Sequence, residues 1–193
     1  GMDYAVDGGK KLRPVLCLTT CKVLGEDVNK ALPLAAAIEI MHNATLVHDD
    51  IEDGDSMRRG SLTVWKKFGL AQGLNIGDGM IFKSYESLLD SSGLPSEKVL
   101  KLVGMLTNTL MKIVEGQHME LNFRERDDVE TKEYEEMVYR KTGLLFGLSL
   151  AGGALIADAS ENVQTNLIEY AKKTGLAFHL SDDILNLTAD QEV

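Results

Sequence analysis

Carboxylates crowd into one short stretch of the chain, where Asp49, Asp50, Glu52, Asp53 and Asp55 fall within seven positions. If this stretch is helical, Asp49 and Asp53 share a face, because positions i and i+4 differ by only about 40°. Like charges at this spacing destabilise a helix unless a cation neutralises them. Mg²⁺ prefers one or two carboxylates together with phosphate oxygens and water. An isolated pair at this spacing is more often a solvated helix end, so a magnesium site needs support from elsewhere in the sequence.

That support comes from the residues around these acids and from a second acidic pair. Arg58 and Arg59 follow directly, and guanidinium groups are suited to bidentate phosphate binding. Asp182-Asp183 ends an apolar stripe just as the first acids do, the two stripes being Leu34, Ile38, Met41 and Thr45, and Leu167, Ala171, Thr174 and Phe178. Two such helices packed together would enclose an apolar shaft with a metal-binding mouth. This arrangement suits a ligand with an apolar tail and a diphosphate head.

Basic residues mark a third segment, Gly8-Gly9-Lys10-Lys11-Leu12-Arg13-Pro14. Pro14 fits the first turn of a helix, where its missing N–H costs nothing. Two glycines, Lys10 and Arg13 at that helix start form a candidate anion site, although basic residues often occupy helix starts without a function. Lys141-Thr142 gives a weaker signal, because a lysine and a hydroxyl inside an amphipathic helix usually lie on the surface.

The elements that must position these side chains all have helical patterns. Apolar residues recur at helical spacing, and no Asn-Gly or Asp-Gly pair lies between alternating runs as a β-hairpin would require. We expect helices at 12–24, 30–53, 71–90, 96–123, 131–157 and 161–187. A chain of 193 residues is long enough for one domain with a sizeable core. The sequence therefore predicts an all-α, single-domain bundle of long helices around a central apolar cavity, over residues 2–193.

Composition excludes several other classes of protein. A formal net charge of −10 disfavours nucleic acid, which requires clustered Lys and Arg. The charge-free apolar stretch at 144–157 is too short to cross a bilayer and indicates a buried core helix. Cys17 and Cys21 are better explained as small core residues than as metal ligands. Such sparse cysteine usage predicts a reducing, cytoplasmic setting.

Taken together, these motifs resemble the trans-isoprenyl diphosphate synthases, the polyprenyl synthetase family that includes farnesyl and geranylgeranyl diphosphate synthases. The resemblance spans nearly the whole chain in the family's order and spacing. It rests on Gly9-Lys10-Lys11-Leu12-Arg13-Pro14, His42, Asp49-Asp50-Ile51-Glu52-Asp53, Arg58-Arg59-Gly60, Gly116-Gln117, Lys141-Thr142 and Phe178 through Asp183.

The resemblance implies a role for each matching residue. It implies two Mg²⁺ ions on Asp49 and Asp53, and a third ion on Asp182 from the opposite helix. The catalytic set would be Asp49, Asp53, Arg58, Lys141 and Asp182. The substrate-binding set would be Lys10, Arg13, His42 and Arg59 at the isopentenyl diphosphate head, with Arg58, Lys141, Thr142 and His179 on the allylic diphosphate side. The implied reaction is the Mg²⁺-dependent 1′-4 head-to-tail condensation of isopentenyl diphosphate with an allylic prenyl diphosphate, carried out by a homodimer.

Product length would follow the depth of the shaft below the first acids. Ala44 and Thr45 lie five and four residues before Asp49, and both are small. The shaft is then not closed there by an aromatic side chain, so we expect geranylgeranyl diphosphate or a longer product. On this interpretation Ala44→Phe shortens the product.

Departures from the family pattern keep two alternatives open. Asn186 stands where the family has a final Asp, and His179 where it has Gln. The family also has a helix before Gly8 and a lysine-bearing loop with further helices after Val193, so we expect these residues to be a partial domain at both ends. One alternative is a non-catalytic or weakly active partner subunit of a prenyl synthase. The other is a class I terpene cyclase, which would have little use for Lys10, Arg13 and His42.

Overall fold

Helices dominate the computed structural model of the protein, which describes residues 1–188. The long helices are α2 (Leu12–Val23), α3 (Leu32–Asp53), α5 (Leu70–Leu89), α6 (Ser96–Phe123), α8 (Leu144–Ile156) and α9 (Glu161–Thr188). The short ones are α1 (Met2–Ala5), a 3₁₀ turn η1 (Val28–Ala31), α4 (Val64–Phe68), α7 (Thr131–Val138) and a π-helical turn η2 (Tyr139–Gly143). The predicted all-α bundle is confirmed, and the predicted helices 12–24, 71–90, 96–123 and 161–187 match within two residues.

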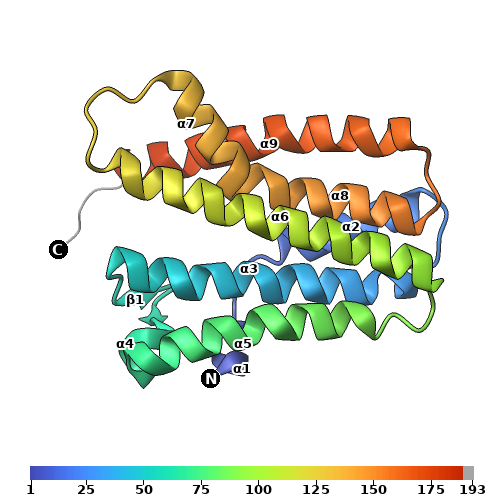
Figure 1. Ribbon diagram of the computed structural model, residues 1–193, viewed down its shortest axis with the longest axis horizontal. Coiled ribbons are helices and arrows are strands. Elements are labelled where there is room, and N and C mark those ends of the chain that lie inside the picture. The colour runs from blue at the N-terminus through green and yellow to red at the C-terminus, as the bar shows by residue number, and fades with distance from the viewer. Residues whose placement is uncertain (189–193) are drawn as a thin grey trace.

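The long helices run along the major axis of the molecule (Figure 1). Helices α3 and α9 run in the same direction and finish at the same end of the bundle (Figure 1). Their acidic residues lie near those carboxyl ends, at Asp49–Asp53 and Asp182-Asp183. The parallel course of the two helices therefore brings both acidic motifs to one end of the bundle.

Helix α3 carries the first acidic motif and has clear start and stop signals. Pro33 occupies its first turn, where a missing N–H costs nothing. Gly54, with φ of 71°, ends the helix in the left-handed conformation that favours glycine. The stop comes one residue after Asp53, so both predicted magnesium ligands lie in the last two turns.

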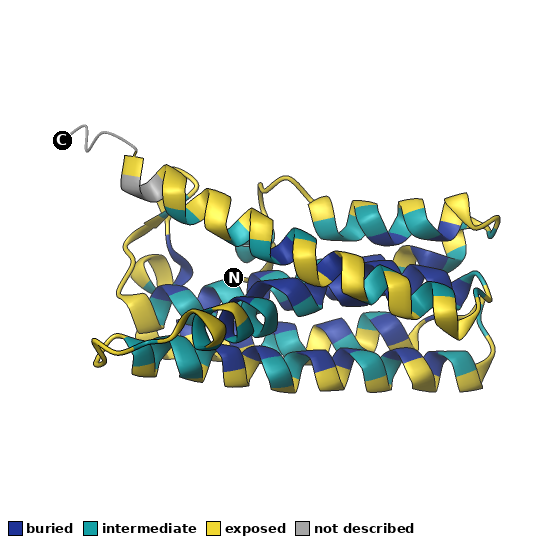
Figure 2. Ribbon diagram, turned by 90° about the horizontal axis from the view of Figure 1, so that it is seen from above, coloured by how far each residue is buried: buried dark blue, intermediate teal, exposed yellow. Residues whose placement is uncertain are grey.

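The core lies between the helices, and buried positions face inwards (Figure 2). Almost every residue of α8 is buried, because α8 packs against α2, α6 and α9. This confirms the core helix expected from the apolar stretch. Cys17 and Cys21 are buried free thiols on the face of α2 that packs on the core, as predicted. None of the helices within residues 1–188 has the length and apolar character that a bilayer span requires.

The structure contains a short hairpin, although the sequence carries no hairpin signal. Strands β1 (Met57–Arg58) and β2 (Ser61–Leu62) pair antiparallel across Arg59 and Gly60. Both turn residues have positive φ, 51° and 76°, as in the type I′ turns of two-residue hairpins. An arginine in that conformation is uncommon, so the turn lacks the Asn-Gly or Asp-Gly signal that sequence reasoning depends on.

Two predicted helices are also interrupted. The segment predicted at 30–53 begins with the 3₁₀ turn η1, whose start is capped by the Asp27 carboxylate accepting from Asn29 N–H. The segment predicted at 131–157 is divided into α7, η2 and α8. Neither interruption changes the apolar periodicity enough to be visible in the sequence.

Candidate active site

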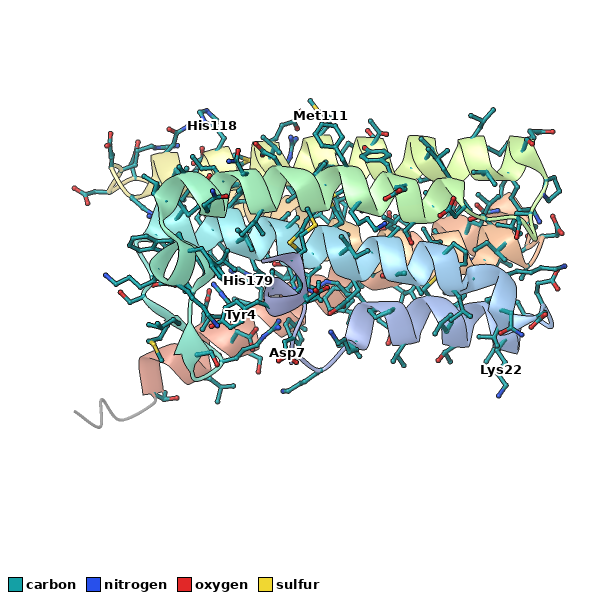
Figure 3. All side chains as sticks on the ribbon, turned by 90° about the horizontal axis from the view of Figure 1, so that it is seen from below. Tyr4, Asp7, Lys22, Met111, His118 and His179 are labelled. Atoms are coloured by element: carbon teal, nitrogen blue, oxygen red, sulfur yellow. The ribbon has the colours of Figure 1, made fainter. Side chains whose placement is uncertain are left out.

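A cavity of about 880 Å³ opens at the acidic end of the bundle. It is lined by α2, α3, α6, η2, α8 and α9, together with the hairpin and the loop before α2. The predicted site residues that line it are Lys10, Arg13, His42, Thr45, Asp49, Asp53, Arg58, Arg59, Lys141, Thr142, His179 and Asp182. Figure 3 shows His179 in the same half of the bundle as Tyr4 and Asp7 of the amino-terminal segment. Segments far apart in the sequence thus converge on one cavity.

The two acidic stripes reach this cavity from opposite walls. The sequence predicts that their helices pack together, but α8 packs against both α9 and α3, and α2 packs against α3 and α8. The intervening helices leave room for the cavity. The side chain of Asn186, the departure in the second motif, lies outside the described side chains.

Asp49 borders the cavity near the end of α3. Its side chain is only 15% exposed, and burial raises the pKa of Asp49 to about 6. The ammonium of Lys141 opposes this rise from 3.9 Å, while Asp53 and Glu120 add to it. Lys141 also pairs with Glu120, so its charge is shared. Asp49 is therefore a buried acid with incomplete compensation for its charge.

The other acids of the motif have their own partners. Asp50 is buried and accepts a hydrogen bond of 2.5 Å from Arg58 Nε. Asp53 pairs with Arg124 at 2.5 Å. Asp50 is thus turned towards the hairpin, whereas Asp49 and Asp53 line the cavity. This division agrees with the i, i+4 pairing predicted from the sequence.

The donor set fits Mg²⁺ held jointly with a diphosphate. Within residues 1–188 no three His, Cys, Asp or Glu side chains are grouped closely enough to hold a metal ion alone. Mg²⁺ needs only one or two carboxylates when phosphate oxygens and water complete its shell. Asp49 and Asp53 on one wall, and Asp182 on the other, offer hard oxygen ligands of this kind. A cation beside Asp49 would also offset the cost of its buried charge.

Arginine side chains face the acids from the hairpin and from α2. The Arg59 guanidinium lies against Gly9, where an added Cβ would come within 2.9 Å of Arg59 Nη1. Gly9 also has a positive φ of 76°, a backbone conformation that favours glycine, whereas the Arg59 side chain could move aside for a larger residue. The loop with Lys10 and the hairpin with Arg59 are thereby held side by side, and both border the cavity.

Arg13 and His42 form a half-buried pair that also lines the cavity. Arg13 Nη1 lies 3.1 Å from His42 Nε2, and the guanidinium lies 4.7 Å from the centre of the Phe146 ring. Burial, then the nearby Arg13, lowers the pKa of His42 to about 3, so its Nε2 accepts from Arg13. Burial also lowers the pKa of Arg13 to about 10, which leaves it charged at neutral pH. Arg13 Nε is buried without an acceptor in the described chain, a donor that an anion would satisfy.

The π-helical turn η2 brings Lys141 and Thr142 inside the site. Both are held there by close helix contacts, because a Cβ on Gly116 of α6 would lie 2.8 Å from Lys141 N. A Cβ on Gly175 of α9 would lie 2.5 Å from Gly143 Cα. Thr142 is only 8% exposed, so the surface location that its sequence context favours is wrong. Single π turns of this kind occur frequently at functional sites.

The two predicted chain-length residues lie in different places. Thr45 lines the cavity. Ala44 is buried in a cluster with Val47, Val64 and Met80, towards α4 and α5. The apolar part of the cavity lining includes Phe178 of the second predicted stripe, and also residues that sequence reasoning missed, namely Leu46, Ile113 and Leu145.

The polar residues missed by sequence reasoning are partners of the predicted ones. Glu120 pairs with Lys141, Arg124 with Asp53, and Tyr134 with Asp183. Glu120 lies four residues after Gly116 on α6, so both residues project from the helix face that meets η2. This spacing is the signal that could have identified Glu120 from the sequence. Arg124 and Tyr134 flank a loop and carry no motif.

Comparison with known proteins gives consistent results. The family model for polyprenyl synthetase matches residues 1–193. The chain is 41% identical over 190 residues to geranylgeranyl pyrophosphate synthase of Geoglobus acetivorans, covering 98% of this chain and 59% of that protein. It resembles a crystal structure of geranylgeranyl pyrophosphate synthase with a TM-score of 0.94 and 38% identity, over 100% of this chain and 58% of the other. It also resembles the crystal structure of geranylgeranyl pyrophosphate synthetase from Pyrococcus horikoshii Ot3, with a TM-score of 0.93 and 35% identity. That match covers 98% of this chain and 58% of the other. The chain therefore spans less than two thirds of the length of these relatives.

Proposed function

We infer, from this site and from the premise that the chain belongs to the polyprenyl synthetase family, that it condenses isopentenyl diphosphate with an allylic prenyl diphosphate. One observation carries the inference. Acids from α3 and α9, cations from α2, η2 and the hairpin, and apolar side chains from α6 and α8 all border a single cavity. A prenyl diphosphate has the two halves that this lining requires, an apolar chain and a charged head.

Magnesium dependence is general in this family, and we propose Asp49, Asp53 and Asp182 as the residues that hold three ions here. Bound in this way, Mg²⁺ would stabilise the negative charge of the departing diphosphate. The protein's own contribution begins with Lys141 and Arg58, which would bind oxygens of the same diphosphate. Breakage of the allylic C–O bond leaves the electron pair on that diphosphate and a carbocation on the chain.

Isopentenyl diphosphate would be bound by Lys10, Arg13, His42 and Arg59. The double bond of isopentenyl diphosphate then attacks the carbocation, forms the new C–C bond, and loses a proton to the released diphosphate. Buried side chains such as Ile113 and Leu145 exclude water that would otherwise capture the carbocation. Thr142 and His179, hydrogen-bonded to each other at 3.1 Å, complete the allylic diphosphate side in this proposal.

Product length is proposed as geranylgeranyl or longer. Thr45 is the small residue that borders the cavity one turn before Asp49, so an extending chain can pass it. Ala44 would act indirectly, since it supports α3 from the opposite side, against Met80. Thr45→Phe is consequently a more direct test of the shaft than Ala44→Phe, which would also overpack a buried cluster.

A homodimer is part of the proposal. Large apolar side chains remain exposed on one face of α5 and one face of α6: Leu70, Leu74, Phe82 and Leu89, and Leu100, Met111 and Val114. Figure 3 shows Met111 pointing away from the bundle on α6. A second copy would bury these side chains, and sedimentation at equilibrium would then give about twice the 21.2 kDa of one chain.

We also propose that residues 2–193 act as one domain in the cytoplasm. Long helices from both halves of the chain share one core, which supports a single domain. Both cysteines are free, as a reducing setting would leave them.

Consumption of isopentenyl diphosphate separates this function from the alternatives. The purified chain should consume radiolabelled isopentenyl diphosphate in the presence of geranyl diphosphate and Mg²⁺. Asp49→Ala should lower the rate at least 100-fold, because the leaving diphosphate loses stabilisation in the transition state. A terpene cyclase would consume the allylic substrate alone, and a non-catalytic partner would bind both substrates without turnover. Either result contradicts the proposed function.

A further inference from the structure

Helix α7 makes one specific polar contact with the acidic end of α9. The Tyr134 hydroxyl donates a 2.5 Å hydrogen bond to Asp183 Oδ2. Burial, more than this hydrogen bond, raises the pKa of Tyr134 well above its ordinary value. The hydroxyl therefore keeps its proton and remains a donor at all physiological pH values. A hydrogen bond from a neutral donor to a carboxylate is stronger than one between neutral groups.

His179 contacts the same carboxylate from within α9. Its Nε2 lies 3.7 Å from Asp183 Oδ2, and its Nδ1 lies 3.1 Å from Thr142 Oγ1 in η2. The Tyr134 and His179 rings lie edge to face, with centroids 6.2 Å apart. Asp183 is thus contacted by one side chain from α7 and one from α9, and His179 connects it to Thr142 in the π turn.

Tyr134 projects from a well-anchored helix. The start of α7 has a capping box in which the Glu130 and Glu133 side chains satisfy each other's backbone N–H groups. Arg126 pairs with Glu133 and with Asp128 in the preceding loop. The helix that carries the Tyr134 hydroxyl is therefore held in place at its start.

The end of α9 has few other anchors. Leu180, Ile184 and Leu185 are exposed, and the last turns of α9 lie at the outside of the bundle (Figure 2). The hydrogen bonds found in the described chain include none to the Asp182 side chain, which borders the cavity. Adjacent residues on a helix project about 100° apart, so fixing Asp183 on the α7 side fixes the direction of Asp182.

We propose that Tyr134 is a positioning residue: by holding Asp183 it orients α9 so that Asp182 faces the bound diphosphate and its metal. This inference rests on the proposed function for the role of Asp182, but the contact itself does not depend on turnover. Tyr134 touches neither substrate in this scheme and acts only through Asp183.

Binding measurements test the proposal without requiring catalysis. Calorimetric titration with Mg²⁺ and inorganic diphosphate should show about tenfold weaker binding for Tyr134→Phe, the loss typical for a hydrogen bond to a charged group. Binding of isopentenyl diphosphate without metal should be unchanged, because its proposed ligands Arg13 and His42 lie on α2 and α3. In an Asp183→Ala background, Tyr134→Phe should cost nothing further.

Tyr139→Phe is the matched control. It removes the same hydroxyl five residues further along the chain, where none of the hydrogen bonds among residues 1–188 involves it, and it should leave both affinities unchanged. Unchanged Mg²⁺–diphosphate binding in Tyr134→Phe overturns the proposal, as does an equal loss for both ligands or a further tenfold loss in the Asp183→Ala background. If the wild-type chain binds Mg²⁺–diphosphate but does not condense substrates, the proposed function fails while this comparison still decides the role of Tyr134.

Discussion

Asp49 occupies a position where its negative charge is unfavourable in the metal-free protein. Burial raises the pKa of Asp49 to about 6, and Lys141, shared with Glu120, does not fully compensate. The folded state therefore binds this proton more tightly than the unfolded chain does. Protonation of Asp49 therefore stabilises the folded state at low pH, and this stabilisation is lost as the pH rises towards 6. Function-related residues commonly carry such a cost.

Replacing Asp49 with a neutral residue should remove this unfavourable charge and stabilise the folded state. We expect Asp49→Asn to raise the free energy of unfolding by about 1–3 kcal/mol at pH 8 in the presence of a chelator, and by little at pH 4. Urea unfolding at the two pH values measures the difference. The lowered pKa of His42 gives an opposite pH dependence, with stability lost as pH falls below about 6.5. His42 is present in both proteins, so its contribution cancels in the comparison.

Asp53→Asn is the control for this experiment. Asp53 pairs with Arg124 at 2.5 Å and is more exposed than Asp49, so its replacement removes a partner and should bring no stabilisation. Equal stabilisation by both variants, or stabilisation by Asp49→Asn that persists at pH 4, would show that buried charge is not the cause.

The sequence allowed functional residues to be identified where their types and their spacing along the chain are enough to indicate a site. Asp49 and Asp53 share a helix face because of their spacing alone, and Arg58 follows them closely in the chain. Tyr134 and Arg124 could not be identified, because their partners Asp183 and Asp53 lie far away in the sequence. Only tertiary packing brings such pairs together.

At the scale of elements, glycines set how closely η2 approaches its neighbours. Gly116 and Gly104 lie on the same helix, α6, but in different surroundings. A Cβ on Gly116 would lie 2.8 Å from Arg140 Cβ and from Lys141 N, whereas a Cβ on Gly104 would meet nothing within 4 Å. The π turn that carries Lys141 therefore depends on one of these glycines and not on the other.

This contrast predicts opposite effects of one substitution. Gly116→Ala should lower the free energy of unfolding by about 1–3 kcal/mol through overpacking, and should displace Lys141. Gly104→Ala should raise the free energy of unfolding by about 0.5–1 kcal/mol, because alanine favours a helix over glycine. Thermal unfolding of both variants provides the comparison. Stabilisation by Gly116→Ala would mean that α6 and η2 are not in close contact.

Periodicity predicted the helices themselves but not their interruptions. The match at 96–123 is complete because its apolar spacing is uniform and Pro95 precedes it. The π turn at 139–143 inserts no visible break, since it changes hydrogen-bond partners while the apolar side chains of 131–157 continue. The hairpin at Arg58–Ser61 depends on an arginine in a left-handed conformation, which local sequence rules do not favour.

For the whole molecule, chain direction determines whether the two acidic motifs can cooperate. Helices α3 and α9 run parallel and end together (Figure 1), which places Asp49 and Asp182 on the same cavity. The sequence suggested this meeting from two apolar-to-acidic stripes, but it did not show that α8 packs against both helices. That separation leaves room for the cavity, and in the proposed function the apolar chain of the substrate extends past Thr45.

Product mass is the measurement that tests this account most directly. The chain is incubated with farnesyl diphosphate and isopentenyl diphosphate, with and without Mg²⁺, and the products are analysed by mass spectrometry. The account predicts a twenty-carbon or longer prenyl diphosphate only with Mg²⁺, and a shorter limit of elongation for Thr45→Phe. Unextended fifteen-carbon substrate, a cyclised hydrocarbon, or the same product distribution from Thr45→Phe would contradict it.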